Sequence, residues 1–238
     1  MSPNKSLPRL AIALDAPSLE PLEPILDALH GLPVLAKVGL SLFTAVGPSV
    51  VHHMRLAGFE VFLDLKLHDI PHQVGLAVAA AARLDVAMLT VHTAGGRAML
   101  EAAVEAAQGR TRIIGVSVLT SLSDADLAET GAGHGVEATV QRRLHLAKTT
   151  GLSGAVMSPL ELQLAPGTPE QFLRVVPGIR ATAGGDDQQR VASAYDAVRA
   201  GASILVVGRP IVSAADPRAA ALAVLADIER GLSDRHQP

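Results

Sequence analysis

The stretch "VFLDLKLHDIP", residues 61–71, begins with apolar residues and then places Asp64, Lys66 and Asp69 close together. A short apolar run that ends in charges is typical of a buried strand. The Ile70-Pro71 pair suits the first turn of a following helix, where proline is well tolerated. The stretch therefore predicts a strand, a charged strand end and a helix in succession, which is one βα unit.

The same unit recurs along the chain, because short β-branched or Leu-rich runs alternate with longer Ala-rich segments of helical period. We expect strands at residues 10–15, 34–39, 60–66, 86–92, 112–118, 154–158, 173–178 and 203–208. We expect helices at residues 18–30, 48–57, 71–83, 96–107, 137–150, 159–165, 188–200 and 216–230. Apolar strands joined by helical crossovers predict a parallel sheet covered by helices, and eight units favour a (β/α)8 TIM barrel of the α/β class. A doubly wound open sheet is the alternative.

No linker or low-complexity segment interrupts this pattern. We therefore expect residues 1–238 to form one barrel domain with short flexible tails at both ends. The segments 120–135 and 181–189 are long and polar, and we expect them to be mobile loops. The last residues, 233–238, are expected to be a frayed tail.

Composition excludes several functional classes. The 238 residues include no cysteine, which excludes disulfides, thiolate metal sites and thiol nucleophiles. The net charge is −3, and the basic residues are spread along the chain, so the sequence predicts no basic surface that would bind nucleic acid or an anionic membrane. The first residues contain no apolar signal core, and no later stretch approaches the roughly 18 unbroken apolar residues of a membrane span, so we expect neither a signal peptide nor a transmembrane segment. We expect a soluble, cytoplasmic protein with a small-molecule partner.

Polar residues end the apolar runs repeatedly and at the same end. In chain order they are Asp15, Lys37, Asp64 with Lys66, His92, Thr120, Ser158, the turn at residues 177–180, and Gly208 with Arg209. One polar residue at a strand end is ordinary, because every strand becomes polar as it leaves the core. Their recurrence where the βα loops of a barrel converge indicates a functional site.

The charges at the end of strand 60–66 have two interpretations. Side chains at i and i+2 share a face of a strand, so Asp64 and Lys66 are expected to pair, and Lys37 on the neighbouring strand would join them. Asp69 lies beyond the strand and could cap the following helix, which would make the group a structural ion-pair network. Alternatively, two carboxylates and two ammoniums can hold a lysine protonated and oriented to deliver a proton.

The other half of the barrel mouth is suited to an anion. Loops after the seventh and eighth strands of barrels frequently bind phosphate through backbone N–H groups and a helix N-terminus. Here these loops are "PGIR" (177–180) and "GRP" (208–210). Arg180 and Arg209 would supply forked donors to phosphate oxygens, and Gly178 and Gly208 would let the backbone approach closely.

These motifs resemble those of the orotidine 5′-phosphate decarboxylase family over nearly the whole chain. The matching elements are "ALD" (13–15), "KVG" (37–39), "DLKLHDIP" (64–71), "VHTAGG" (91–96), "VLTS" (118–121), "VPGIR" (176–180), "DQQR" (187–190) and "VVGRPI" (206–211), in the family's order. The resemblance implies a (β/α)8 barrel that converts orotidine 5′-monophosphate to UMP and CO2 in pyrimidine biosynthesis. It also implies a homodimer with sites at the subunit interface, and neither metal nor organic cofactor.

Carried over to this sequence, the resemblance implies a role for each matching residue. Lys66 would donate the proton to C6 of the pyrimidine, with Lys37, Asp64 and Asp69 around it, and Asp69 would reach into the partner's site. The substrate contacts implied are Asp15 and Lys37 to the ribose, Thr120 to the pyrimidine, Gln188, Arg180 and Arg209 to the phosphate, and His92 near the ribose or phosphate. Gln73 stands where the family commonly has a threonine that contacts the ribose.

Two rival interpretations remain open. Sugar-phosphate enzymes with the same barrel share D-x-K-x-x-D but use it with Mg²⁺, and such a site needs a further acidic ligand near strand 34–39. That strand ends in Lys37, whose charge opposes a cation. The other rival is a catalytically silent barrel that binds nucleotides.

Overall fold

The eight expected strands form one closed ring. The structure is a computed structural model that describes residues 7–165, 167, 171–179 and 192–235. Its strands are β1 Leu10–Ala13, β2 Val34–Gly39, β3 Glu60–Leu67, β4 Met88–His92, β5 Arg112–Val116, β6 Gly154–Val156, β7 Leu173–Val176 and β8 Ile204–Val207. All neighbours pair in parallel, and β8 pairs with β1 to close the barrel. The predicted (β/α)8 barrel is therefore confirmed.

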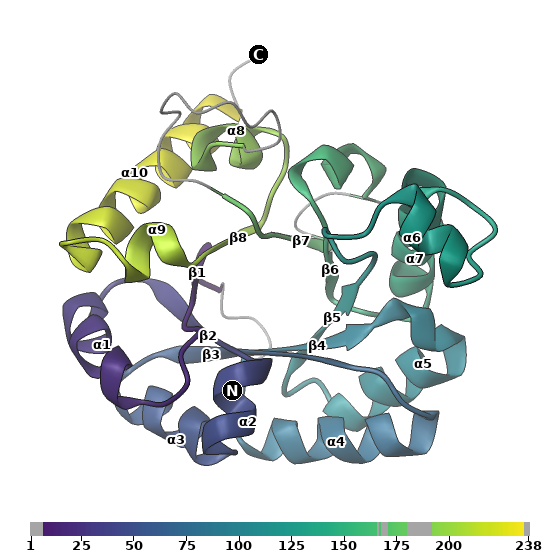
Figure 1. Cartoon of the computed structure of the whole chain (residues 1–238), viewed down its shortest axis with the longest axis horizontal. Helices are drawn as coiled ribbons and strands as arrows, with labels where there is room; N and C mark the ends of the chain where they lie inside the picture. The colour runs from purple at the N-terminus through teal and green to yellow at the C-terminus, as the bar shows by residue number, and fades with distance from the viewer. Residues whose placement is uncertain (1–6, 166, 168–170, 180–191, 236–238) are drawn as a thin grey trace.

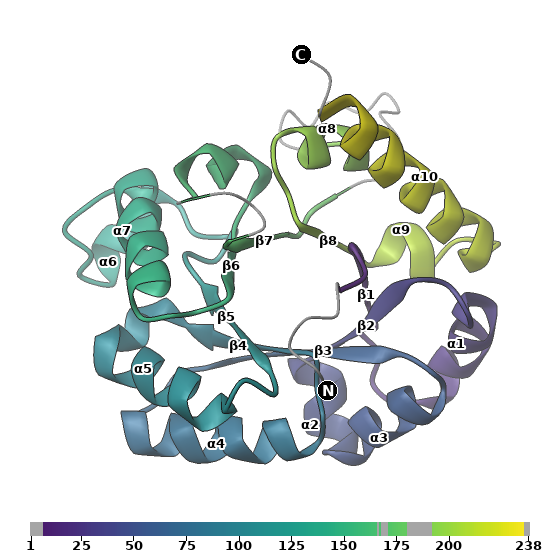
Figure 2. The same cartoon turned by 180° about the vertical axis from the view of Figure 1, so that it is seen from behind.

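Helices surround the ring on its outer side, as Figures 1 and 2 show from opposite directions. The α-helices are α1 Glu23–Leu29, α2 Leu40–Val46, α3 Ser49–Leu56, α4 Pro71–Arg83, α5 Gly96–Ala107, α6 Asp124–Glu129, α7 Val136–Thr149, α8 Ala194–Arg199, α9 Arg209–Val212 and α10 Pro217–Arg235. The described residues also contain three 3-10 helices, namely η1 Glu20–Leu22, η2 Thr93–Gly95 and η3 Pro159–Leu164. None of the helices in the described part of the chain has both the length and the apolar character that crossing a bilayer demands.

The predictions for helices, loops and the C-terminal tail were wrong in four places. The segment 120–135 contains α6, which Ser123 and Asp126 start with a reciprocal capping box. Helices α2 and α9 follow directly after β2 and β8 and were not predicted. Helix α10 continues to Arg235, so residues 233–235 are helical and not a frayed tail. The expected loop 181–189 lies outside the described residues.

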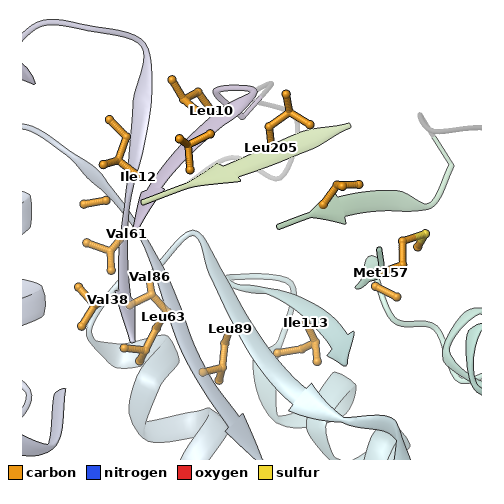
Figure 3. Packing of buried hydrophobic residues seen from close by; sticks show 14 of the residues in the cluster. Leu10, Ile12, Val38, Val61, Leu63, Val86, Leu89, Ile113, Met157 and Leu205 are labelled. Carbon is orange, nitrogen blue, oxygen red and sulfur yellow. The ribbon is translucent and has the colours of Figure 1, made fainter. Parts of the chain in front are cut away.

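The core divides into two layers because side chains of a strand alternate between its faces. Leu10, Ile12, Val61 and Leu63 point outward toward the helices and belong to an outer core, part of which Figure 3 shows. An inner core fills the barrel with the alternate residues of the same strands, including Ala11 and Phe62, together with Leu35, Met88 and Ile114. The inner positions continue to the C-terminal strand ends, where polar residues replace apolar ones.

We expect Gly154→Ala to destabilise the barrel. A Cβ at this position of β6 would overlap the backbone carbonyl of Leu173 on β7 and lie 2.6 Å from the Leu173 Cβ. Neither neighbour can move without shifting a barrel strand, so we expect a loss of about 1–3 kcal/mol in the free energy of unfolding, measured with urea. Gly133→Ala is the matched control, because no atom lies within 4 Å of its added Cβ. Equal urea midpoints for the two variants would contradict the prediction.

Candidate active site

A chain of alternating charges lies at the C-terminal ends of β2 and β3. Lys66 Nζ donates to Asp64 Oδ2 over 2.9 Å, and Lys37 Nζ lies 3.4 Å from the same oxygen. The Lys37 side chain is only 9% exposed and that of Asp64 13%, whereas that of Lys66 is 31% exposed. The predicted cluster of Lys37, Asp64 and Lys66 is therefore present, and Lys66 is its most accessible member.

Asp64 stays ionised in spite of its burial. Burial is the largest single influence and would raise the pKa of this carboxyl. The charges of Lys37 and Lys66, with hydrogen bonds from Lys66 and Thr90, outweigh it and hold the pKa of Asp64 below its usual value. The carboxylate can therefore keep both lysines oriented at neutral pH.

The backbone of β3 departs from a regular strand where it carries Lys66. Lys66 has a φ of 52°, in the left-handed region that side chains other than glycine rarely occupy. The pairing with β4 shifts at the same place, because Leu63 lies opposite Leu89 but Leu67 lies opposite Val91. Backbone distortion of this kind concentrates at functional sites.

Asp15 extends the cluster on the side of β1. Its Oδ1 lies 3.7 Å from Lys37 Nζ, and its side chain is 61% exposed at the barrel mouth. A Cβ at Gly39 would lie 2.9 Å from Asp15 Oδ1 and 3.4 Å from Lys37 Nζ. The glycine of "KVG" thus leaves room for this pair, and Asp15 is free to face a ligand.

Asp69 is not among the carboxylates that pair with Lys37 and Lys66 in the described part of the chain, which are Asp15 and Asp64. It is exposed, and its carboxylate accepts a hydrogen bond of 2.6 Å from the backbone N–H of Ile70. Ile70, and not Asp69, occupies the N-cap position of α4. The interpretation of Asp69 as the cap of this helix was wrong.

His92 ends β4 next to the charged cluster. Its ring stacks on that of His68, with centroids 5.4 Å apart, and its Nδ1 accepts a hydrogen bond from the Ala94 N–H. Partial burial, and then the positive charges of Arg143, His68 and Lys66, lower the pKa of His92 to about 4. The imidazole is therefore neutral at neutral pH and can accept a hydrogen bond but adds no charge.

A cavity of about 620 Å³ opens beside the ends of β5, β6 and β7. Thr120, Ser158, Pro177 and Gly178 line it, so three strand ends that the sequence singled out face one space. Gly178 has a φ of 79°, which glycine adopts without strain. The volume is in the range of small-molecule sites.

The expected phosphate side is described in part. Gly208 follows β8 beside Ala13 of β1, and the exposed Arg209 is the first residue of α9. The strand ends that carry Gly178 and Gly208 are neighbours, because β7 pairs with β8. Arg180 and Gln188 lie outside the described residues.

Two residues near the cluster were missed by the sequence analysis. Arg143 of α7 donates a 2.6 Å hydrogen bond to the carbonyl of Ser117, just beyond β5, and burial lowers its pKa. Thr90 of β4 donates to Asp64 Oδ1 over 2.9 Å. Arg143 gave no signal, because it lies on an outer helix. Thr90 is a polar residue inside the apolar strand "MLTVH", and this exception to the apolar pattern could have marked it as a candidate site residue.

In the described ranges, no three His, Asp or Glu side chains group in a way that could hold a metal ion. The carboxylates of Asp15 and Asp64, both at the mouth, each lie within 4 Å of the Lys37 ammonium. An ammonium thus occupies the place between them where a divalent cation would need to lie.

We expect His92 to lower the stability of the protein as the solution becomes acidic. An unfolded histidine takes up a proton near pH 6.5, but folded His92 does so only near pH 4. The unfolded state therefore gains protons first, and stability falls as the pH decreases through this window. His92→Asn should show a smaller loss between about pH 7 and about pH 5 in urea unfolding. An imidazole NMR titration of His92 with a midpoint near 6.5 would contradict the prediction.

Comparison with known proteins agrees with these features. The family model described as "Orotidine 5'-phosphate decarboxylase / HUMPS family" matches residues 8–224. An orotidine 5′-phosphate decarboxylase of Opitutus terrae is 47% identical over 92% of this chain and 98% of its own, and one of Halorhodospira halophila is 49% identical over 93% and 96%. The crystal structure of the enzyme of that name from Lactobacillus acidophilus superposes with a TM-score of 0.82, at 35% identity, over 92% of this chain and 98% of its own.

Proposed function

We propose, since the chain belongs to the orotidine 5′-phosphate decarboxylase family, that it converts orotidine 5′-monophosphate to UMP and CO2 with Lys66 as the proton donor. The enzyme is a carboxy-lyase of pyrimidine biosynthesis. The observation that carries the proposed role of Lys66 is its pairing with a buried carboxylate that a second lysine also contacts.

The reaction makes a specific demand on the protein. Loss of CO2 from C6 leaves an electron pair in the plane of the pyrimidine ring, where the ring cannot delocalise it. The site must therefore stabilise the developing charge electrostatically. An ammonium near C6 does so and can then supply the proton, so that the C–C bond electrons end in a new C–H bond.

The Lys37-Asp64-Lys66 chain suits this demand. Asp64 holds Lys66 by a 2.9 Å hydrogen bond, which fixes the ammonium before substrate arrives. The ionised carboxylate of Asp64 would also face the substrate carboxylate, and repulsion between them is relieved when CO2 leaves. Lys37, which contacts the same oxygen, also balances the charge of Asp64.

The remaining site residues would bind the rest of the substrate. We assign the ribose hydroxyls to Asp15 and Lys37, and the pyrimidine to Thr120 at the wall of the cavity. Phosphate contacts are assigned to Gly178, Gly208 and Arg209, and to Arg180 and Gln188, which lie outside the described residues. We assign to His92 a neutral hydrogen-bonding position near the ribose or phosphate.

We further propose a homodimer in which Asp69 completes the partner's site. Asp69 is exposed, and its carboxylate binds the Ile70 N–H, whereas Lys66 pairs with Asp64. The neighbouring Ile70 is 63% exposed, and Leu40, the first residue of α2 directly after β2, is 55% exposed. Apolar side chains exposed beside a charged site are suited to a subunit contact.

The substrate is the only small-molecule partner that we assign, and we assign no nucleic acid, membrane or cofactor. We also propose a cytoplasmic location and one domain over residues 1–238.

We expect purified protein to convert orotidine 5′-monophosphate to UMP both with and without EDTA. The absorbance of the substrate measures its loss. Lys66→Ala should lower kcat by about 10⁴-fold or more, because it removes both the proton donor and the charge at C6. Lys148→Ala, which changes an exposed lysine of α7, is the matched control and should keep wild-type activity.

Three results would contradict the proposed function. Activity lost in EDTA and restored by Mg²⁺ would favour the sugar-phosphate type of site. Tight UMP binding by folded wild-type protein without turnover would indicate a silent barrel. Full activity of Lys66→Ala would remove its proposed role.

The shared site predicts that two inactive variants rescue each other. In a mixed dimer of Lys66→Ala and Asp69→Ala subunits, one site carries both defects and the other carries neither. Mixing the two after mild dissociation should therefore restore up to about a quarter of wild-type kcat, since half of the dimers are mixed and each has one intact site. Mixtures that stay inactive, although sedimentation shows that subunits exchange, would place Asp69 outside the partner's site.

A further inference from the structure

The side chain of Thr90 contacts both ends of the Asp64-Lys66 segment. Thr90 is fully buried in β4, on the inner face between Met88 and His92. Its hydroxyl donates to Asp64 Oδ1 over 2.9 Å and accepts a 2.8 Å hydrogen bond from the backbone N–H of Lys66. One hydroxyl thus uses its donor and one of its acceptor positions on two neighbouring functional residues.

The contact with Asp64 determines how that carboxylate is oriented. Thr90 binds Oδ1, whereas both ammoniums, Lys66 Nζ and Lys37 Nζ, approach Oδ2. With Oδ1 held, rotation of the carboxylate about its Cβ–Cγ bond is restricted, and Oδ2 keeps its direction toward the lysines. A hydrogen bond to the charged form also favours ionisation of Asp64.

The contact with Lys66 stabilises an unusual backbone conformation. Lys66 has a left-handed φ of 52°, within the stretch where the pairing of β3 with β4 shifts. A residue held in this region needs support from its surroundings. In this stretch the backbone N–H of Lys66 on β3 donates to the Thr90 hydroxyl. A side chain of β4 thus accepts the hydrogen bond that a backbone carbonyl of β4 would accept in a regular sheet.

We infer that Thr90 is a positioning residue of the active site, which fixes the orientation of the Asp64 carboxylate and the backbone of Lys66 so that the ammonium points at the reacting carbon. Its part in turnover rests on the proposed function. Thr90 is fully buried, so it acts through its two neighbours and not on the substrate. The hydroxyl is the essential group, and serine can supply it, whereas valine keeps the shape and cannot.

The test compares Thr90→Val, Thr90→Ser and Thr111→Val. Thr111 is also buried and donates to the Val86 carbonyl over 2.9 Å, before the start of β5 and away from the mouth. Thr111→Val therefore measures the effect of losing a buried threonine hydroxyl elsewhere in the barrel. For each variant, kcat, KM, the pH profile and the Asp64 side-chain ¹³C titration are measured, with urea unfolding as a check of folding.

We expect Thr90→Val to lower kcat by roughly 10- to 100-fold, the range that corresponds to losing a hydrogen bond to a charged group, with KM nearly unchanged. The Asp64 titration and the acidic limb of the rate profile should both move to higher pH. Thr90→Ser should restore most of kcat and the wild-type titration. Thr111→Val should lose stability without these changes.

Other outcomes would overturn the inference. A wild-type kcat in folded Thr90→Val would contradict the inference. An equal loss of kcat in Thr90→Ser and Thr90→Val would also contradict it, because it would indicate a steric role for the side chain. An unmoved Asp64 titration would also do so. The titration needs no turnover, so inactive wild-type protein would refute the proposed function while the positioning of Asp64 by Thr90 is still tested.

Discussion

One carboxylate oxygen contacted by two lysine ammoniums is the interaction on which the rest of the site depends. Asp64 Oδ2 accepts contacts from both Lys66 and Lys37, and the side chains of Asp64 and Lys37 are largely buried. Burial alone would favour the neutral acid, so the arrangement requires that both lysines and the buried Thr90 hydroxyl stay in place together. The barrel meets this requirement, because β2, β3 and β4 are adjacent parallel strands whose ends lie at one level.

Features governed by periodicity were predictable from the sequence. The alternation of side chains put Asp64 and Lys66 on one face, and the order of strands put Lys37 beside them. Helices α4 and α5 begin and end as expected, because Pro71 and the Gly95-Gly96 pair mark their starts plainly. These features depend on local chemistry and on a repeated unit, both of which a single sequence contains.

Features that depend on contacts between strands were not predictable in the same way. Nothing in "LDLKL" indicates the left-handed backbone of Lys66, because it arises from the shifted pairing with β4. Asp69 fits a helix cap by position, and only the three-dimensional arrangement shows that Ile70 occupies the N-cap and that the Asp69 carboxylate binds the Ile70 N–H. Helix α6 is different, since its capping box from Ser123 to Asp126 was present in the sequence but lay inside a polar segment.

The shifted pairing has a consequence for protein engineering. From Leu63 to Leu67 strand β3 advances four residues while β4 advances two, so β3 carries two additional residues over the same span. An idealised barrel with matched strands has no room for them. Grafting the D-x-K-x-x-D sequence onto such a scaffold would reproduce the residue types without their geometry. A transplant of this chemistry must therefore carry three neighbouring strands, namely the irregular β3, β4 with the supporting Thr90, and β2 with Lys37.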